Sequence, residues 1–152
     1  MFAIRKDDLT DEDVRGLLAI HLAGMQENTP AGHVFALDLS GLLAPEVTVW
    51  TLRDDGVLAG IGALKALSDG TGEIKSMRTH PGHLRKGVGA ALLDHILDEA
   101  ATRGYWRISL ETGVGGSFDA ALALYRTRGF TNGAAFSDYQ ASPYNQFLHL
   151  AL

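Results

Sequence analysis

The sequence contains no cysteine among its 152 residues. This absence excludes disulfide bonds, thiolate metal ligands and a cysteine nucleophile. A covalent intermediate on a thiol is therefore ruled out. Direct transfer between two bound substrates becomes the default for any group-transfer chemistry.

Long apolar runs and clustered positive charge are also missing. No stretch approaches the ~18 apolar residues that span a bilayer, and Met1–Asp8 has no apolar core of signal-peptide length. The formal net charge is −5 and the basic residues are scattered, whereas nucleic acid and anionic membranes require a clustered positive face. We expect a cytoplasmic protein that binds neither nucleic acid nor membrane, and whose partner is a small molecule or a cationic amine.

The most informative segment, Gly72–Leu93, reads as a strand, a glycine turn and a helix. Two glycines and two cations stand where the helix begins, in the run Arg85–Gly89. Backbone N–H groups at such a helix start can converge on one anion, and the helix dipole adds positive potential there. The segment therefore predicts a pyrophosphate cradle.

Two familiar glycine loops do not fit this cradle. A nucleotide P-loop needs Lys followed by Ser or Thr after its last glycine, but Gly89 is followed by Ala90 and Ala91. A dinucleotide fingerprint needs a third glycine where Leu92 stands, although Glu111 lies near the distance at which that motif places an acidic residue. The loop of acyl-CoA N-acyltransferases remains.

The remaining pattern resembles the GNAT superfamily of acyl-CoA N-acyltransferases, whose loop is roughly Gln/Arg-x-x-Gly-x-Gly/Ala after a strand that ends in Pro. A second segment, Ala121–Phe130, is similar to the family's Ala-x-x-Leu-Tyr-x-x-x-Gly-Phe. The runs Gly72–Met77 (GEIKSM) and Leu110–Gly113 (LETG) resemble one bacterial branch. The resemblance covers nearly the whole chain and implies a single N-acetyltransferase domain over residues 1–152.

Hydrophobic periodicity and turn signals predict a mixed α/β fold. Strands are expected at residues 2–5, 47–53, 57–67, 74–79, 107–111 and 147–152. Helices are expected after Asp11, over 34–43, from Val88 to Gly104 and over 118–128. Because a helix separates them, strands 74–79 and 107–111 should be parallel neighbours with a right-handed crossover. The resemblance implies a mostly antiparallel sheet in which this central parallel pair splays at the acyl-CoA site, with helices on both faces.

The resemblance implies acetyl-CoA as the acyl-donor co-substrate. Amides of the glycine loop would meet the CoA diphosphate, and the backbone of Met77 and Thr79 would hydrogen-bond the pantetheine arm. The cofactor-binding residues expected on this basis are Met77, Arg78, Thr79, Arg85, Lys86, Gly87, Val88, Gly89, Ala90 and Phe118. Leu84 replaces the family's Gln or Arg and Phe118 replaces a frequent Asn, and both changes predict weaker CoA binding.

Acetyl transfer to an amine requires a neutral nucleophile, but an alkyl amine with a pKa of ~10.4 is almost fully protonated at pH 7. A carboxylate near the acceptor is therefore expected as a general base. Glu73 and Glu111 flank the gap between the parallel strands, and Glu111 is favoured because it lies at a strand's carboxyl end. The alternatives are that Glu111 pairs with Lys75 across the strands, and that Glu73 only solvates a strand edge.

Tyr125 resembles the superfamily's general acid, a tyrosine whose hydroxyl donates a proton to the departing thiolate. A pKa of ~10 keeps such a hydroxyl protonated at neutral pH. The alternative is a buried ring beside Leu122 and Leu124 whose hydroxyl is satisfied by the backbone.

His21 and Met25 lie one turn apart on the first predicted helix and His33 follows a breaker at 28–32, so these side chains are candidates for the acceptor pocket. Further candidates for this pocket are Lys75, Arg78, Tyr139 and Tyr144. Ordinary packing is the alternative for each. A cation there would suit a carboxylate-bearing acceptor, such as an amino acid or a similar small amine.

Six histidines invite a metal hypothesis. His80 and His83 lie across a Pro-Gly turn without a third ligand nearby in sequence, so no metal is expected.

These residues predict an N-acetyltransferase that passes acetyl from acetyl-CoA to a small-molecule amine, with a homodimer left open. A protein or peptide acetyltransferase is one alternative and needs an open groove instead of a lidded pocket. A non-catalytic acyl-CoA sensor is another, motivated by Leu84 and Phe118. The segment 26–45 separates the first two readings, because the resemblance places it over the acceptor pocket.

Overall fold

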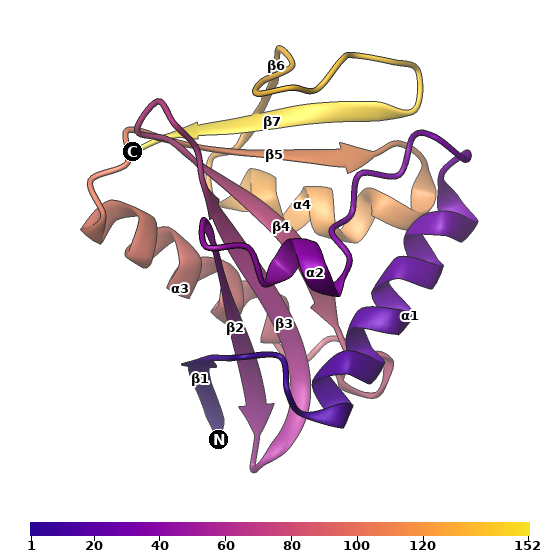
Figure 1. The fold of residues 1–152 in the computed structure, drawn as a ribbon, viewed down its shortest axis with the longest axis vertical. Helices are drawn as coiled ribbons and strands as arrows, with labels where there is room; N and C mark the ends of the chain where they lie inside the picture. The colour runs from indigo at the N-terminus through magenta and orange to yellow at the C-terminus, as the bar shows by residue number, and fades with distance from the viewer.

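Seven strands form one sheet in the order β1-β2-β3-β4-β5-β7-β6, and the computed structural model describes all residues from 1 to 152 (Figure 1). The strands are β1 (Phe2–Lys6), β2 (Val47–Asp54), β3 (Val57–Ala66), β4 (Gly72–Thr79), β5 (Arg107–Gly113), β6 (Thr131–Gly133) and β7 (Asn145–Ala151). The helices are α1 (Glu12–Asn28), α2 (Leu39–Leu42), α3 (Val88–Thr102) and α4 (Asp119–Thr127), with short 3₁₀ turns at Pro81–His83 and Gly116–Phe118.

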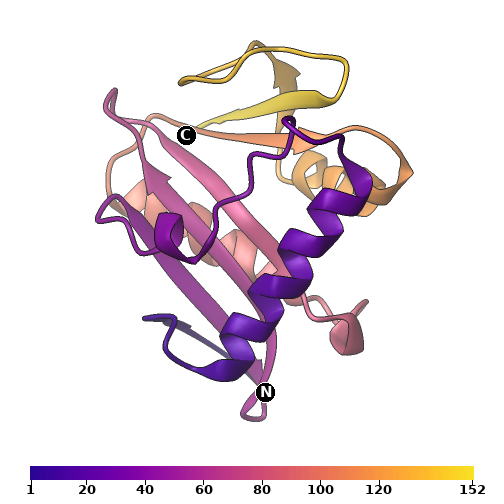
Figure 2. The same cartoon turned by 45° about the vertical axis from the view of Figure 1, so that its right-hand side comes forward.

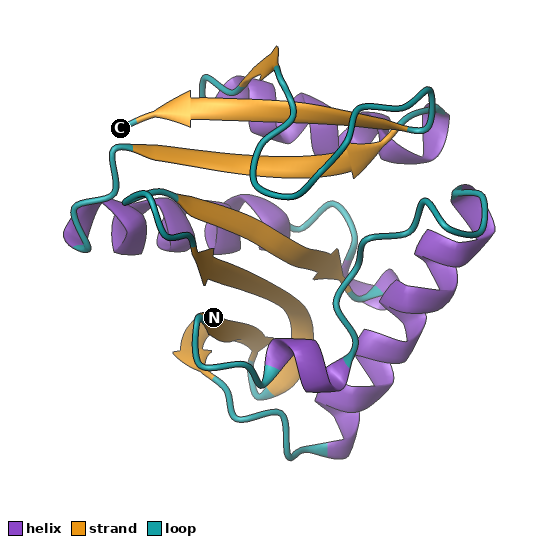
Figure 3. Cartoon of the chain, turned by 45° about the horizontal axis from the view of Figure 1, so that its top comes forward, coloured by secondary structure: helices purple, strands orange, loops and turns teal.

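β4 and β5 are the parallel pair of an otherwise antiparallel sheet. They pair only at Gly72 with Ile108 and at Glu73 with Ser109. Beyond these residues the two strands separate toward their carboxyl ends, as Figure 3 shows. The predicted fold class, a mixed sheet with a splayed central parallel pair, is confirmed.

β4 carries one extra residue relative to β3. The register passes from Lys75 opposite Ala63 to Arg78 opposite Ile61, so three steps on β4 match two on β3. Ser76, inside this bulge, has a φ of +56°, in the left-handed region that non-glycine residues rarely adopt. Three regular steps would place Lys75 and Arg78 on opposite faces of the sheet, and the bulge brings them to the same face.

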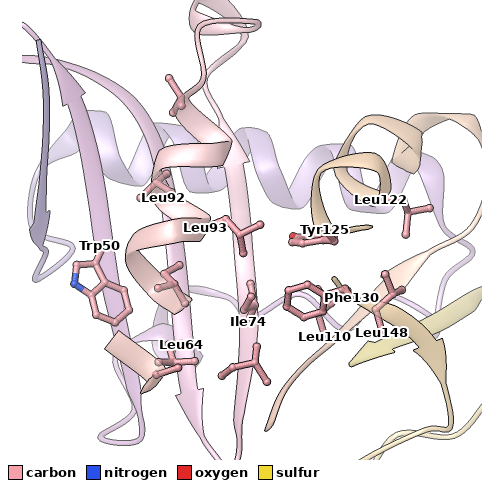
Figure 4. Packing of buried hydrophobic residues seen from close by; sticks show 14 of the residues in the cluster. Trp50, Leu64, Ile74, Leu92, Leu93, Leu110, Leu122, Tyr125, Phe130 and Leu148 are labelled. Carbon is pink, nitrogen blue, oxygen red and sulfur yellow. The ribbon is translucent and has the colours of Figure 1, made fainter. Parts of the chain in front are cut away.

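Helices cover both faces of the sheet, as predicted. α1 and α2 pack over one face, in a cluster that includes Leu17, Leu42 and Ile61. α3 and α4 pack over the other face, and Figure 2 shows α1 in front of the sheet with α3 behind it. Figure 4 shows Leu93 of α3 beside Ile74 of β4. Burying a side chain as completely as that of Leu93 contributes about 1.5–3 kcal/mol.

The start of α3 lies unusually close to the sheet. A Cβ at Gly60 of β3 would lie 2.6 Å from Cγ1 of Val88, a contact that real Cβ atoms do not make. Glycine at this position therefore lets the first turn of α3 rest on β3. This close packing sets the N-terminus of the helix beside the carboxyl end of β4.

Two elements differ from expectation. α2 covers only Leu39–Leu42 instead of spanning 34–43, because the Asp38 side chain accepts a hydrogen bond from Gly41 N at 2.9 Å and so caps a helix that starts there. The edge strand β6 was not predicted, since its three residues have no apolar pattern. It forms through pairing with β7. None of the helices combines the length and the apolar character that crossing a membrane requires.

Candidate active site

A cavity of about 390 Å³ opens where β4 and β5 separate. Its walls come from Lys75–Thr79 of β4 and Leu110–Thr112 of β5, with α1 on one side and the start of α4 on the other. Leu84 and Gly89 extend it to the N-terminus of α3. One cavity thus joins this helix start to the carboxyl end of β5.

The N-terminus of α3 offers free backbone donors. Its N-cap Gly87 has a φ of +83°, and no side chain caps the helix. The first helical hydrogen bond of α3 runs from Ala91 N to Gly87 O. The N–H groups of Val88–Ala90 therefore have no helical partner. Arg85 and Lys86 are exposed and form no ion pair within the chain. Free amides beside two unpaired cations fit a diphosphate group.

The two departures from the family pattern occupy different places in this region. Leu84 is 60% exposed at the rim of the cavity. Phe118 is buried and lines the cavity, and a Cβ at Gly113 would lie 2.4 Å from its Cζ. Phe118 is therefore an apolar wall packed tightly on the end of β5.

Glu73 is held in a buried network and does not line the cavity. Its Oε2 accepts hydrogen bonds from the Tyr139 hydroxyl at 2.5 Å and from Lys75 Nζ at 3.2 Å, and Lys75 Nζ also donates to the Tyr139 hydroxyl at 2.7 Å. Burial, together with the charge of Glu73, raises the pKa of Tyr139 and keeps this hydroxyl protonated. Glu73 is 2% exposed on an inner strand, so the hypothesis that it solvates a strand edge is wrong.

Glu111 borders the cavity from β5 and is only partly exposed. Burial raises the pKa of its carboxyl to about 7; the nearby charge of Lys75 opposes this rise and that of Glu73 adds to it. The alternative that Glu111 forms an ion pair with Lys75 is wrong, because Lys75 pairs with Glu73. Glu111 is thus a carboxyl group that exchanges its proton near neutral pH.

Tyr125 reaches the same cavity from α4. Its ring packs edge-on against Phe130 with centroids 5.6 Å apart, and Figure 4 shows the two rings together. Burial raises the pKa of its hydroxyl and is the sole cause of the shift, since the hydroxyl has no hydrogen-bond partner in the chain. The alternative of a hydroxyl satisfied by the backbone is therefore wrong, and Tyr125 lines the cavity as a protonated residue.

The structure separates the predicted acceptor residues into two groups. His21, Met25 and Lys75 line the cavity. His33 instead packs against Tyr144, with ring centroids 4.7 Å apart, and Tyr139 is engaged with Glu73. Cavity residues that the sequence did not single out for the site include Gly24, Asn28, Phe35, Ala36 and Ser117. Their position in or beside the segment 26–45 was the signal for most of them.

Arg78 projects from β4 toward α1. Its Nε donates to Nδ1 of His21 at 3.1 Å and its Nη2 to the His21 carbonyl oxygen at 3.4 Å. Burial, with a smaller effect of the Arg78 charge, lowers the pKa of His21 to about 4. The imidazole is therefore neutral at neutral pH, and its Nδ1 accepts the hydrogen bond.

No three His, Asp or Glu side chains come together as metal ligands. His80 and His83 have ring centroids 5.8 Å apart, and Nδ1 of His80 accepts a hydrogen bond from Gly82 N. The two histidines belong to the turn between β4 and α3.

Comparison with known proteins gives matches over most or all of the chain. The sequence model of the Acetyltransferase (GNAT) family matches residues 11–130. The Escherichia coli K12 protein named uncharacterized N-acetyltransferase YedL is 46% identical over 152 residues, which cover 100% of this chain and 96% of that protein. The Bacillus subtilis 168 protein named uncharacterized N-acetyltransferase YsnE is 46% identical over 145 residues, which cover 95% of this chain and 96% of that protein.

A third relative, the IAA acetyltransferase of Azospirillum brasilense, is 34% identical over 125 residues, which cover 81% of this chain and 80% of that protein. Among solved structures, a Klebsiella pneumoniae protein assigned as an acyl-CoA N-acyltransferase is 31% identical and superimposes with a TM-score of 0.83. The superposition covers 100% of this chain and 98% of the Klebsiella chain.

Proposed function

This chain belongs to the Acetyltransferase (GNAT) family and is an acyltransferase, and on that premise we propose that it transfers acetyl from acetyl-CoA directly to the amine of a small molecule. The observation that carries the proposal is one cavity running from the free amides of α3 to Glu111 and Tyr125. A diphosphate cradle, a proton acceptor and a proton donor are the groups that aminolysis of a thioester requires.

The residues around the cradle fit coenzyme A. The amides of Val88–Ala90, with Arg85 and Lys86, would hold the diphosphate through charge-assisted hydrogen bonds. Beyond Glu73 the backbone groups of β4 that face β5 have no strand partner. Polar groups in the stretch Met77–Thr79 are therefore available for the amide-bearing pantetheine arm. Acetyl-CoA would supply the activated acyl group, and these residues would orient it.

Glu111 is the proposed general base, in preference to Glu73. A base works best when its pKa lies near the working pH, and the pKa of about 7 at Glu111 meets this condition. Its position on the cavity wall lets it take a proton from the bound ammonium group, directly or through a water molecule. Glu73 is already bonded to Lys75 and Tyr139 and lies outside the cavity.

Tyr125 is the proposed general acid. Its hydroxyl would protonate the departing thiolate, whose ordinary pKa is ~8.5. Burial makes Tyr125 a weaker acid than a free tyrosine. The same burial raises the pKa of a thiol released into the cavity. The pKa values of the donor and the acceptor therefore rise together, and the proton transfer remains feasible.

The segment 26–45 supports a small acceptor over a peptide. Phe35 and Ala36 line the cavity, and Lys75 Nζ donates to the Phe35 carbonyl oxygen at 3.3 Å. These contacts hold the segment over the acceptor side of the cavity. A small molecule fits beneath such a cover, whereas an extended peptide needs an open groove.

A thiol-release assay tests the proposal directly. Purified protein is mixed with acetyl-CoA and a panel of small amines, peptides and IAA, the last because the Azospirillum relative is named for it. The chain has no cysteine, so a thiol reagent reports released CoA alone. We expect amine-dependent release, with small amines preferred to peptides.

A thermal-shift comparison of acetyl-CoA, NAD and ATP accompanies the assay, because a ligand that binds the folded state raises the unfolding midpoint. Stabilisation by acetyl-CoA is expected. Stabilisation by NAD in its place, or the absence of CoA release with every amine, would overturn the proposed function.

A further inference from the structure

Two cations border the acceptor side of the cavity, and only one is neutralised. Lys75 forms an ion pair with the buried Glu73 at 3.2 Å. Arg78 forms no ion pair with any carboxylate in the chain. Burial lowers the pKa of Arg78, because its charge is partly removed from water without a compensating anion. Burying such a charge costs free energy unless a group of opposite charge pairs with it, and a bound ligand would supply that group.

The guanidinium is fixed in place but not saturated. Of the five N–H groups of an arginine, the one at Nε and one at Nη2 donate to His21, and the others have no acceptor within the chain. A Cβ at Gly24 would lie 2.9 Å from Nη2, so α1 passes as close as a glycine allows. α1 therefore holds one edge of the guanidinium while Arg78 also lines the cavity.

Arg78 lies on the opposite face of β4 from the diphosphate cradle. Met77 points toward α3, since a Cβ at Gly62 would meet its Sδ at 2.6 Å and Ile96 at 2.9 Å. Arg78 points toward α1, because of the bulge at Ser76. The unpaired cation thus belongs to the acceptor side, and the exposed Arg85 and Lys86 remain for the phosphates.

We propose that Arg78 binds a carboxylate of the acceptor, so that the substrates of this enzyme are amino carboxylic acids. The guanidinium would clamp the carboxylate through its free N–H groups, as planar arginine forks do. Glu111 on β5 would face the ammonium group of the same molecule. The cavity would then set a cation opposite the carboxylate of an amino acid and a carboxyl group opposite its ammonium group. His21 orients the fork by accepting hydrogen bonds from Nε and Nη2 of Arg78.

This inference rests on the proposed function and is tested by comparing acceptors that differ only in the carboxylate. CoA release is followed with a panel of L-amino acids and the matching L-amino acid amides. For the wild-type protein we expect kcat/KM to be about 10- to 100-fold higher for the best amino acid than for its amide, the range given by charge-assisted hydrogen bonds. The amide is the control, since it keeps the amine and the side chain.

The variants Arg78→Gln and Arg78→Lys locate the preference. R78Q should abolish the difference between acid and amide by losing activity on the acid alone, and R78K should restore part of it, since it keeps the charge without the fork. The matched control is Arg85→Gln, which should reduce stabilisation by acetyl-CoA and keep the preference. Thermal stabilisation of R78Q by acetyl-CoA should equal that of the wild type, which shows that the fold and the cradle are intact.

Failure of the inference is distinguishable from failure of the proposed function. If amides or carboxylate-free amines react as well as amino acids, or if R78Q loses activity equally on all acceptors, Arg78 does not bind the acceptor carboxylate. In both cases amine-dependent CoA release continues in the wild type and the proposed function stands. If no amine of any class releases CoA, the proposed function fails and the inference falls with it.

Discussion

Lys75 and Arg78 lie three residues apart on β4, yet both side chains face the α1 side of the sheet. The bulge at Ser76 causes this, because one extra residue reverses the alternation of faces beyond it. The result is a pair of cations on one wall of the cavity. One is neutralised by Glu73 within the chain, and the other is left for a ligand.

The first prediction concerns Glu111 as general base. Glu111→Gln should lower kcat at pH 7 by about 10²- to 10⁴-fold, the usual contribution of such a group. In the wild type, activity should rise with pH through about 7, because the carboxyl must be ionised to accept a proton. The variant should lose this limb and keep only the rise set by the pKa of the amine. The exposed Glu46, changed to Gln, is the control and should retain the wild-type profile.

The same carboxyl gives a prediction for stability. Its pKa in the folded protein, about 7, is higher than its ordinary value of 4.5, so the folded state binds the proton more tightly than the unfolded state. The free energy of unfolding should therefore fall as pH rises from about 4.5 to about 7 and stay lower above it. E111Q should raise the unfolding midpoint relative to the wild type at pH 8 but not at pH 4. An equal shift at both pH values would contradict the assignment.

Tyr125 is tested by removing its hydroxyl. Tyr125→Phe should reduce turnover by about 10²-fold or more, with little change in stabilisation by acetyl-CoA, because the ring and its packing on Phe130 are kept. Tyr105→Phe removes a hydroxyl outside the cavity and is the control. A rate for Y125F equal to that of the wild type would remove this residue from the mechanism.

The contact between Gly113 and Phe118 gives a prediction for packing. Gly113→Ala places a Cβ 2.4 Å from Cζ of Phe118, so the ring must move, at a cost of about 1–3 kcal/mol. The displaced ring should also weaken stabilisation by acetyl-CoA, since Phe118 lines the cavity. Denaturant unfolding of G113A, F118A and the double variant measures the coupling. In the absence of the ring, G113A should cost little; additive costs would show that the two residues are independent.

Local signals predicted most of the architecture. The resemblance to the GNAT superfamily is confirmed by the family match, and it rested on the glycine loop before α3 and the tyrosine motif of α4. The parallel pairing of β4 and β5 followed from the helix between them. Their separation was implied by the family. Each of these features depends on a short stretch of sequence, in which hydrophobic periodicity and turn residues are enough to predict it.

Long-range contacts were beyond the reach of such signals. The hydrogen bond from Tyr139 to Glu73 joins residues 66 positions apart, and no local pattern indicates that Tyr139 completes the network of Lys75 and Glu73. The bulge at Ser76 was equally hidden, because serine carries no mark of a positive φ. The orientation of Arg78 depends on that bulge. The sequence alone therefore could not decide whether Arg78 contacts the cofactor or the acceptor.

The meeting of β4 and β5 at only two residue pairs makes the sheet two half-sheets with a seam between them. Backbone hydrogen bonds hold each half internally, and across the seam buried side chains beneath α3 and α4 belong to one hydrophobic cluster. A thioester bound along the open edges would contact both halves, so its binding would stabilise the folded protein against separation of the two halves. Amide exchange along the inner edges of the seam should therefore slow as the concentration of this ligand rises.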